Sequence, residues 1–343
     1  MDLARLGYDD FLADWLSGID EAGIVPARVG RVDRGAVLVF TASGPCHLAT
    51  RVPAATGDWV ALSAERDRIV AVAPRRTVIT RADPARADGQ VLAANVEFVW
   101  VVAGLDRPVR PGRLERAFVL AWETGAEPRL VLTKADLSDD PEAAATTAAA
   151  LAPGVPVHLT SAVTGQGLDG LVGHLATGRT TTLLGESGAG KSTLVNALTG
   201  ADLLATDAVR KGDAKGRHTT TARHLVPLPA GGVLIDTPGL RQLGLWSGGS
   251  GLAATFSDIE ELAGGCRFAD CAHGPEPGCA VQAAIADERL AARRLAGYEK
   301  LRRELEHAEG VRSEHERRAD DRRFGKMAKA VMKEKEARRR VQP

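Results

Sequence analysis

A glycine-rich segment at residues 185–193 constrains the fold of this chain most strongly. It reads Gly-Glu-Ser-Gly-Ala-Gly-Lys-Ser-Thr and matches the pattern G-x-x-x-x-G-K-[ST]. The apolar pair Leu183 and Leu184 precedes it and the helix-prone stretch 194–198 follows, so the pattern predicts a strand, a loop and a helix. The predicted phosphate-binding residues are Gly185, Glu186, Ser187, Gly188, Ala189, Gly190, Lys191, Ser192 and Thr193.

The chemistry of this loop follows from its residue types. Glycines allow successive backbone N–H groups to face the phosphate oxygens of a nucleotide. Lys191 reaches the β and γ phosphates, and the hydroxyl of Ser192 is a ligand for Mg²⁺. We therefore expect a nucleotide-binding α/β domain in which Lys191 also contributes to catalysis.

A second phosphate element follows the apolar run 233–235. Asp236, Thr237, Pro238 and Gly239 form the pattern D-x-P-G at the end of a predicted buried strand. The carboxylate of Asp236 can hold Mg²⁺ through water, and the N–H of Gly239 can sense the γ phosphate. Such a tetrapeptide is a common turn, but its position downstream of a phosphate loop indicates a nucleotide switch.

Guanine recognition is predicted by the segment Thr133-Lys134-Ala-Asp136, which follows the apolar run 130–132. A carboxylate at Asp136 accepts hydrogen bonds from N1–H and the 2-amino group of guanine, whereas adenine would leave that charge unpaired. The stem of Lys134 can lie along the base. Ser161 and Ala162, which follow the run 157–159, can bring a backbone N–H toward the guanine O6.

The order of these motifs is unusual. In ordinary GTPases the phosphate loop precedes the base-reading loop, but here Asp136 precedes Lys191 by 55 residues. One site still results if the chain is circularly permuted, because the termini of a domain commonly lie close together. Permutation also makes the γ-phosphate-sensing segment 236–239 lead directly into the C-terminal part of the chain.

A loop that could close over the γ phosphate lies at 216–221, which reads Gly-Arg-His-Thr-Thr-Thr. One of its three threonines should complete the Mg²⁺ coordination, and we favour Thr220. Leu240 stands directly after Gly239, where many GTPases carry the Gln that orients the attacking water. Slow intrinsic hydrolysis is therefore expected, with a rearrangement or a partner completing the catalytic site.

A second kind of site is predicted near the C-terminus. Cys266, Cys271, His273 and Cys279 supply three thiolates and one imidazole, which is the ligand set of a closed tetrahedral zinc site. Such a site has no open position for water, so the Zn²⁺ should be structural. Cys46 stands apart in a predicted strand and is expected to be a small core residue.

The remaining pattern divides the chain into three predicted parts. A short helical lead-in around Phe11 and Trp15 precedes short β-prone runs that suggest a small closed barrel of the OB type. The expected parts are 1–85 (lead-in and barrel), 86–245 (permuted GTPase domain) and 246–343 (zinc-binding domain with a basic tail). The expected barrel strands are 36–41, 46–52, 58–62, 68–72 and 77–80. A linker is expected at 82–89. Near the C-terminus, one helix is expected at 280–308.

Charge is unevenly distributed although the formal net charge is zero. Residues 25–81 carry nine Arg against four acids, and residues 311–343 carry twelve Lys and Arg against six acids. Both segments suit a polyanion, although either could be an ordinary solvated surface. The barrel has few aromatics, which favours recognition of folded RNA through phosphates and shape. Neither a signal peptide nor a membrane span is predicted, so we expect a cytoplasmic protein.

The succession of T-K-A-D, S-A, G-E-S-G-A-G-K-S-T, G-R-H-T-T-T, D-T-P-G and C-x4-C-x-H-x5-C, behind an OB-like barrel, resembles the ribosome small-subunit-dependent GTPases (RsgA). The resemblance runs from about residue 24 to beyond 300. It implies GTP hydrolysis stimulated by the small ribosomal subunit, a role in its late maturation, and His218 as the candidate catalytic residue, and the basic segments fit contact with its rRNA. The usual Asn of the base loop is Thr133 here, a change that bears on guanine affinity rather than on selectivity.

Two other functions remain open at the level of sequence. The chain could be an RNA-binding assembly factor in which GTP only locks one conformation, or an ATP-driven enzyme. If small subunits fail to accelerate turnover, the assembly factor is favoured over a true hydrolase. If ATP binds more tightly than GTP, the ATP-driven enzyme is favoured. We expect a monomer that binds GTP and GDP.

Overall fold

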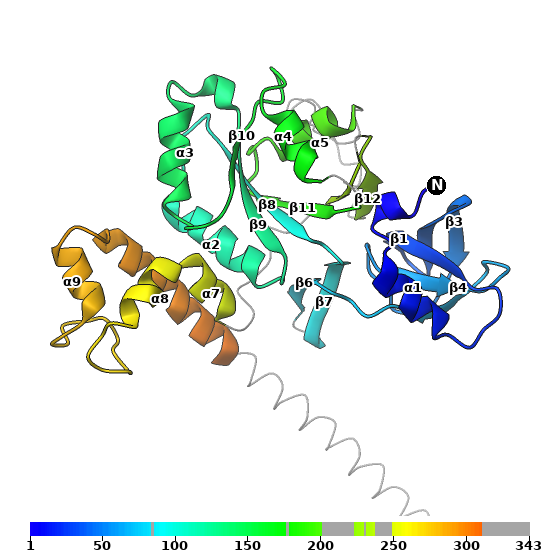
Figure 1. The fold of residues 1–343 in the computed structure, drawn as a ribbon, viewed down its shortest axis with the longest axis horizontal. Coiled ribbons are helices and arrows are strands. Elements are labelled where there is room, and N and C mark those ends of the chain that lie inside the picture. The colour runs from blue at the N-terminus through cyan, green and yellow to red at the C-terminus, as the bar shows by residue number, and fades with distance from the viewer. Residues whose placement is uncertain (84–85, 176–177, 201–222, 230, 237–248, 311–343) are drawn as a thin grey trace, which may run out of the picture.

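The computed structural model describes residues 1–83, 86–175, 178–200, 223–229, 231–236 and 249–310. Three bodies are visible in Figure 1: an N-terminal sheet, a central sheet covered by helices, and a group of C-terminal helices. The α/β architecture predicted from the motif order is confirmed, including the separate N-terminal sheet and the C-terminal Cys/His cluster. Across the described residues, no helix combines the length and apolarity that crossing a bilayer requires.

The N-terminal part begins with η1 (Ala4–Leu6) and α1 (Asp10–Ser17), the predicted lead-in helix. The side chain of Asp9 caps α1 by accepting from the N–H of Leu12 across 3.2 Å. Five antiparallel strands follow and pair in the order β3-β2-β1-β4-β5. They are β1 (Val25–Asp33), β2 (Ala36–Thr41), β3 (Gly44–Ala49), β4 (Trp59–Leu62) and β5 (Ile69–Val72).

These five strands share one apolar core, which includes Val29, Val39, Leu48, Val60 and Ile69. Between residues 25 and 72, all of which are described, β3 and β5 are the two edges of the sheet. The OB-fold is a partly open five-stranded barrel, and this arrangement agrees with it. Cys46 packs against this core, as predicted.

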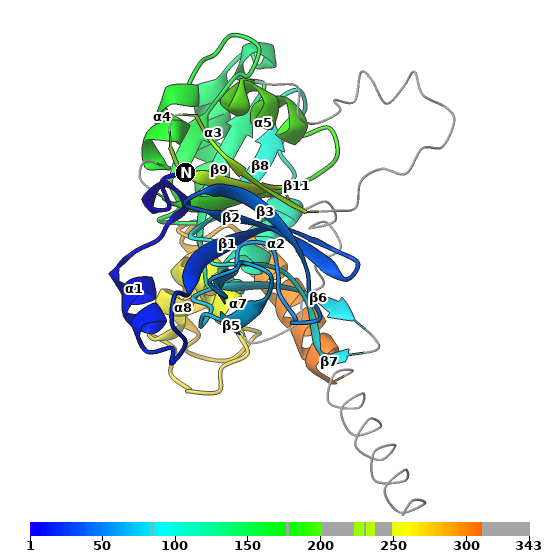
Figure 2. The ribbon, with the colours of Figure 1, turned by 90° about the vertical axis from the view of Figure 1, so that its right-hand side faces the viewer.

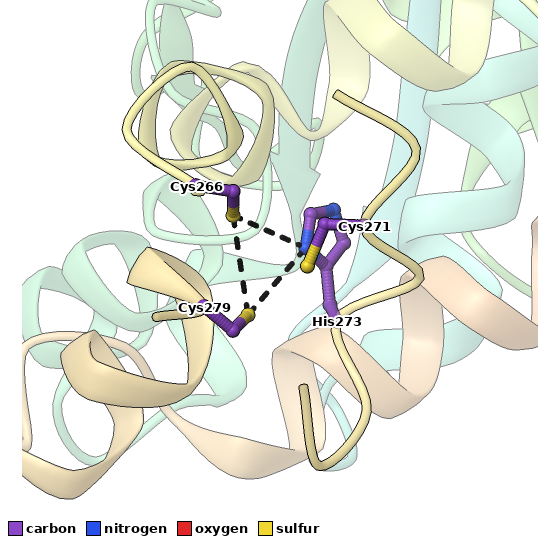
Figure 3. A group of neighbouring side chains, drawn as sticks. All are labelled: Cys266, Cys271, His273 and Cys279. Carbon is purple, nitrogen blue, oxygen red and sulfur yellow. Dashed lines mark hydrogen bonds between the residues drawn. The ribbon is translucent and has the colours of Figure 1, made fainter. Parts of the chain in front are cut away.

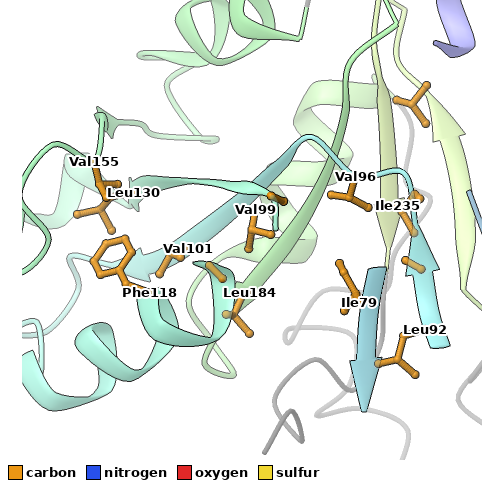
Figure 4. Close-up of a cluster of buried hydrophobic side chains, with 14 of the residues drawn as sticks. Ile79, Leu92, Val96, Val99, Val101, Phe118, Leu130, Val155, Leu184 and Ile235 are labelled. Carbon is orange, nitrogen blue, oxygen red and sulfur yellow. The ribbon is translucent and has the colours of Figure 1, made fainter. Parts of the chain in front are cut away.

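The predicted set of barrel strands is wrong in two places, because one strand is missing from it and one run lies outside the barrel. The strand β1 was missed because Gly30 lies at a bulge between Val29 and Arg31, which disrupts the two-residue alternation of buried side chains. The run at 77–80 belongs to β6 (Val78–Asp83), which pairs with β7 (Arg86–Ala94) outside the barrel. The expected linker at 82–89 therefore lies largely in this hairpin, whose Ile79 and Leu92 reach the core beneath the central sheet (Figure 4).

The central sheet has the strand order β10-β9-β8-β11-β13-β12 and is parallel except for β12. Its strands are β8 (Phe98–Gly104), β9 (Glu127–Thr133), β10 (Val157–Leu159), β11 (Thr180–Gly185), β12 (His224–Pro227) and β13 (Val233–Asp236). The chain runs outward from β8 to β10 and then returns to β11, next to β8. The strand order reverses at this point, which is where α/β sheets bind ligands.

Helices cover both faces of this sheet. The helices α2 (Pro111–Trp122) and α3 (Pro141–Ala149) pack on one face, whereas α4 (Leu168–His174) and α5 (Lys191–Thr199) pack on the other. Alternate residues of β8 enter opposite cores, with Val99 and Val101 on the α2 side (Figure 4) and Trp100 on the α5 side. A strand buried on both faces explains the continuous apolar run in the sequence.

The C-terminal part comprises α7 (Ser250–Thr255), α8 (Ser257–Ala263), α9 (Ala280–Ala286) and a helix whose described part is 292–310. Val119 of α2 joins its apolar core, so these helices dock on the central domain. The single helix predicted at 280–308 is wrong. It is broken after α9, where Glu288 adopts a φ of 57° that a continuous right-handed helix excludes.

Candidate nucleotide site and metal centre

The predicted nucleotide-binding segments gather at one edge of the central sheet. The carboxyl ends of β9, β10, β11 and β13 lead into the base loop (133–136), Ser161, the phosphate loop (185–193) and Asp236. Because these strands are parallel neighbours, their carboxyl ends form one rim. The reversed order along the chain is thus compatible with a single site.

The phosphate loop has the backbone that its glycines allow. Gly188 and Gly190 have φ values of 74° and 84°, which favour glycine. Lys191 donates from Nζ to the carbonyl oxygens of Gly185 and Glu186, at 2.8 and 2.5 Å. The ammonium therefore lies against the loop that the sequence predicts to hold phosphates. Ser192 is half-buried and Thr193 is exposed in the first turn of α5.

The base loop is bonded directly to the phosphate loop. Thr133 donates from Oγ1 to the carbonyl oxygen of Ala189 across 2.6 Å, and Lys134 donates from Nζ to that of Gly188 across 2.7 Å. Lys134 also pairs with Asp106 at 2.9 Å. Asp136 is exposed in the short helix η2 (Ala135–Leu137) that follows. These bonds place the two loops side by side.

Ser161 and Ala162 lie next to the base loop. The N–H of Ala135 donates to the carbonyl oxygen of Thr160 across 3.1 Å, which joins the loops after β9 and β10. The buried Ser161 accepts from the N–H of Thr164 at its Oγ, across 3.2 Å. Its hydroxyl therefore shapes the turn that follows β10.

Asp236 is half-buried at the end of β13, opposite His224 of β12. The remaining predicted residues, His218, Thr220 and Gly239, lie outside the described residues. The structure therefore brings together the base loop, Ser161, Ala162, the phosphate loop and the strand that ends at Asp236.

The position of Arg107, Arg110 and Arg113 beside the phosphate loop was not predicted from the sequence. Arg113 forms an ion pair with Glu186, and Arg107 donates to the carbonyl oxygen of Ser187 across 3.2 Å. The hydrogen bond from Arg113, together with the charges of Arg107 and Arg110, lowers the pKa of the Glu186 carboxyl. The sequence feature that could have indicated them is the spacing of these arginines, one every three residues, directly after a predicted buried strand.

The predicted basic surface of the barrel is partly neutralised. Arg28 is buried and donates to the carbonyl oxygens of Gly57, Asn95 and Leu6, and burial lowers its pKa to about 10. It therefore joins the lead-in, the barrel and the central domain. Further arginines of the segment pair with acids, namely Arg75 with Asp58, Arg76 with Asp9, Arg68 with Glu21 and Arg31 with Asp33. Figure 2 shows the N-terminal strands lying against the central sheet.

Cys266, Cys271, His273 and Cys279 converge on one point, as predicted (Figure 3). Their ligand atoms all lie within 4.8 Å of one another. The Sγ atoms of Cys266 and Cys279 are 3.9 Å apart, and each is 3.7 Å from Nδ1 of His273. A tetrahedral ion with Zn–S bonds of about 2.3 Å would require sulfurs about 3.8 Å apart.

Surrounding groups hold these four side chains in place. The N–H of Gln282 donates to Sγ of Cys279, and its side-chain amide donates to the carbonyl oxygen of His273 across 2.6 Å. Burial acts to raise the pKa of the Cys266 thiol, but hydrogen bonds from the backbone of Ala280 and Val281 contribute to a net lowering. The four residues can hold a metal ion.

Comparisons with known proteins agree with this geometry. Residues 72–246 match the family model described as RsgA GTPase. The chain is 46% identical to the small ribosomal subunit biogenesis GTPase RsgA of Streptomyces coelicolor, covering 97% of this chain and 95% of that protein. It is 42% identical to RsgA 2 of Lactiplantibacillus plantarum, over 94% and 89% of the two chains.

Solved structures give the same result for the fold. YjeQ from Thermotoga maritima superimposes with a TM-score of 0.62 at 27% identity, over 82% of this chain and 98% of that one. YloQ, described as a circularly permuted GTPase, has a TM-score of 0.61 at 23% identity, over 84% and 97%. The description of YloQ as circularly permuted agrees with the order of the motifs in this chain.

Proposed function

The chain belongs to the RsgA GTPase family, and on that premise we propose that it binds the small ribosomal subunit, acts in its late maturation, and hydrolyses GTP faster when the subunit is bound. It is a GTP hydrolase. The observation that carries the proposal is the 46% identity, over 97% of this chain, to a protein named for small-subunit biogenesis.

Each part of the nucleotide has a proposed binding group. Asp136 binds the guanine edge, while Lys134 lies along the base. Ser161 and Ala162 approach the guanine O6 through the backbone, and the phosphate loop surrounds the β phosphate. Thr133 supports the site by holding the base loop against Ala189. Lys191 neutralises charge that develops on the β and γ phosphates during hydrolysis.

A GTPase of this family implies Mg²⁺, and we assign the ion to Ser192, Thr220 and Asp236. The half-buried Asp236 and Ser192 fit this role, since hydroxyl and carboxylate oxygens are the donors that Mg²⁺ prefers. Bound there, the ion would neutralise phosphate charge. His218 is the proposed residue that orients the attacking water, because Leu240 occupies the position where many GTPases carry Gln.

The other modules have supporting roles in this proposal. The Cys/His cluster holds one structural Zn²⁺ that fixes the C-terminal helices, which dock on α2. Of the three units expected at 1–85, 86–245 and 246–343, the first boundary falls instead before Val78, because the hairpin of β6 and β7 packs with the central sheet. The basic segment 311–343 adds contact with rRNA. A protein that acts on assembling subunits works where they assemble, so the proposed location is the cytoplasm, and the proposed oligomeric state is a monomer.

A GTPase assay with and without purified small subunits tests the proposal. We expect slow turnover alone and faster turnover with subunits, and large subunits serve as the control. If small subunits bind but leave turnover unchanged, the protein is instead an RNA-binding factor locked by GTP. If ATP competes better than GTP, the guanine assignment fails. Loss of stimulation in a His218→Ala variant that still binds subunits would support the catalytic role.

A further inference from the structure

A cationic groove runs from the phosphate loop toward the C-terminal helix. Arg107, Arg110, Arg113, Arg116 and Lys300 line a hollow of about 620 Å³, and no Asp or Glu is among its described lining residues. Arg116 on α2 pairs with Glu304 on the helix 292–310, so these two helices lie side by side there (Figure 1). We call these five residues the arginine groove.

Most charges in the arginine groove are available to a ligand. Among the described residues, Arg110 and Lys300 are exposed and have no acidic partner within ion-pair distance. The side chain of Arg113 is 59% exposed although it contacts Glu186. The groove also begins at the amino end of the twelve-residue helix α2, whose dipole adds positive potential.

The composition of the arginine groove favours a phosphodiester backbone over bases or a peptide. Guanidinium groups bind phosphate oxygens in a bidentate manner, and several cations in a row match a repeating anion. The lining contains no aromatic side chain on which a base could stack. In the barrel segment, Arg28 is buried, and four further arginines pair with acids, namely Arg31, Arg68, Arg75 and Arg76.

We propose that the arginine groove is a docking surface for an rRNA strand of the small subunit, an inference that rests on the proposed function. RNA bound there lies against the phosphate loop, because Arg107 contacts Ser187 and Arg113 contacts Glu186. In this proposal the GTPase domain itself contacts RNA, in addition to the basic segment 311–343.

Charge reversal at Arg110 and Lys300 tests this assignment. We expect the double variant Arg110→Glu, Lys300→Glu to bind small subunits roughly tenfold or more weakly, with the slope of log affinity against log salt reduced by about two. The milder pair Arg110→Gln, Lys300→Gln should show the same effects in smaller degree, which guards against misfolding of the reversed pair. Arg289→Glu is a control for charge reversal elsewhere on the surface, because its side chain is also exposed, at 59%, and lies outside the groove.

A photo-crosslinker identifies the partner. Gly112 lines the groove, and an added Cβ there meets no atom within 4 Å, so position 112 is suited to introducing p-benzoylphenylalanine. Irradiated complexes should yield adducts with rRNA, whereas adducts only with ribosomal proteins would overturn the proposal. It is also overturned if the wild type binds subunits and both groove variants match its affinity and salt slope. If the wild type itself fails to bind subunits, the proposed function fails first.

Discussion

Thr133 donates a hydrogen bond from Oγ1 to the carbonyl oxygen of Ala189 across 2.6 Å, and this bond joins the base loop to the phosphate loop. Thr133 stands where the GTPases that this chain resembles usually carry Asn. The Thr133 side chain is shorter than that of Asn, but its hydroxyl reaches the Ala189 carbonyl because the next residue, Gly190, has no side chain. A Cβ at Gly190 would lie 2.9 Å from Oγ1 of Thr133. Close approach of the two loops therefore compensates for the shorter side chain.

Replacing Thr133 with Val should weaken nucleotide binding. Valine keeps the shape of the side chain but removes the donor, which costs about 1 kcal/mol or more because the Ala189 carbonyl then lacks this partner. We expect roughly five- to tenfold weaker affinity for fluorescently labelled GDP in equilibrium titrations. Thr133→Ser retains the hydroxyl and should stay close to wild type. Equal affinity of the Val variant and the wild type would contradict a role for this bond.

Asp136→Asn should change which base is bound. The carboxylate accepts two hydrogen bonds from guanine, whereas an amide presents a donor that repels the 2-amino group. Xanthine carries a carbonyl at that position and can accept from the amide. We expect affinity for GDP to fall at least tenfold and affinity for xanthosine diphosphate to rise, measured by competition. Unchanged preference for guanine would place the base elsewhere.

The loops of the site could be predicted because each is encoded locally. A glycine at positive φ, a hydroxyl or a carboxylate directly after an apolar run signals a loop at the end of a strand, as at Gly188, Thr133 and Asp236. The strand order that brings these loops together required the additional inference of circular permutation. The sheet topology agrees with that inference.

What could not be predicted depends on contacts between distant residues. The bulge at Gly30 obscured β1, and the hairpin of β6 and β7 owes its position to burial of Ile79 and Leu92 beneath another domain. Counting arginines in the barrel likewise could not reveal that Arg28 is buried. Local composition does not predict which residues a side chain contacts in the folded protein.

Cys279→Ser should release the metal and loosen the C-terminal helices. A serine hydroxyl is a poor zinc ligand, and the apolar core that includes Cys279 is small. We expect zinc content by elemental analysis to fall from about one per chain toward zero, with faster proteolysis within 249–310. Cys46→Ser, outside the cluster, is the control. A variant that retains stoichiometric zinc would exclude Cys279 as a ligand.

His158 should make stability fall as the pH is lowered. Burial, aided by the charges of His174 and Arg129, lowers the pKa of His158 from 6.5 to about 4. The unfolded chain therefore binds the proton more readily, so folded stability is lost between pH 6.5 and 4 and not above. Urea unfolding of wild type and His158→Asn at pH 7.5 and 5 should show a smaller acid loss in the variant. Parallel losses in both proteins would contradict this.

Arg294 links the C-terminal helices to the central domain through hydrogen bonds and ion pairs. Its side chain is 3% exposed and bonds to Glu115 of α2, to both carboxylate oxygens of Asp258, and to the carbonyl oxygens of Leu151 and Thr255. The guanidinium also lies 4.1 Å from the ring centre of Phe256. The two bodies are thus joined through a buried charge network.

Arg294→Met should destabilise the protein by about 3–5 kcal/mol, because removing one partner of a buried ion pair leaves the other charge uncompensated. Glu115, whose side chain is 2% exposed, would keep only the longer 3.8 Å pair with Arg293. Urea unfolding measures the loss, and adding Glu115→Gln to Arg294→Met should recover part of it by removing the stranded charge. Arg293→Gln, at a half-exposed side chain, should cost less than about 1 kcal/mol. If Arg294→Met unfolds at the wild-type urea concentration, docking of the C-terminal helices depends on the apolar contacts around Val119 instead.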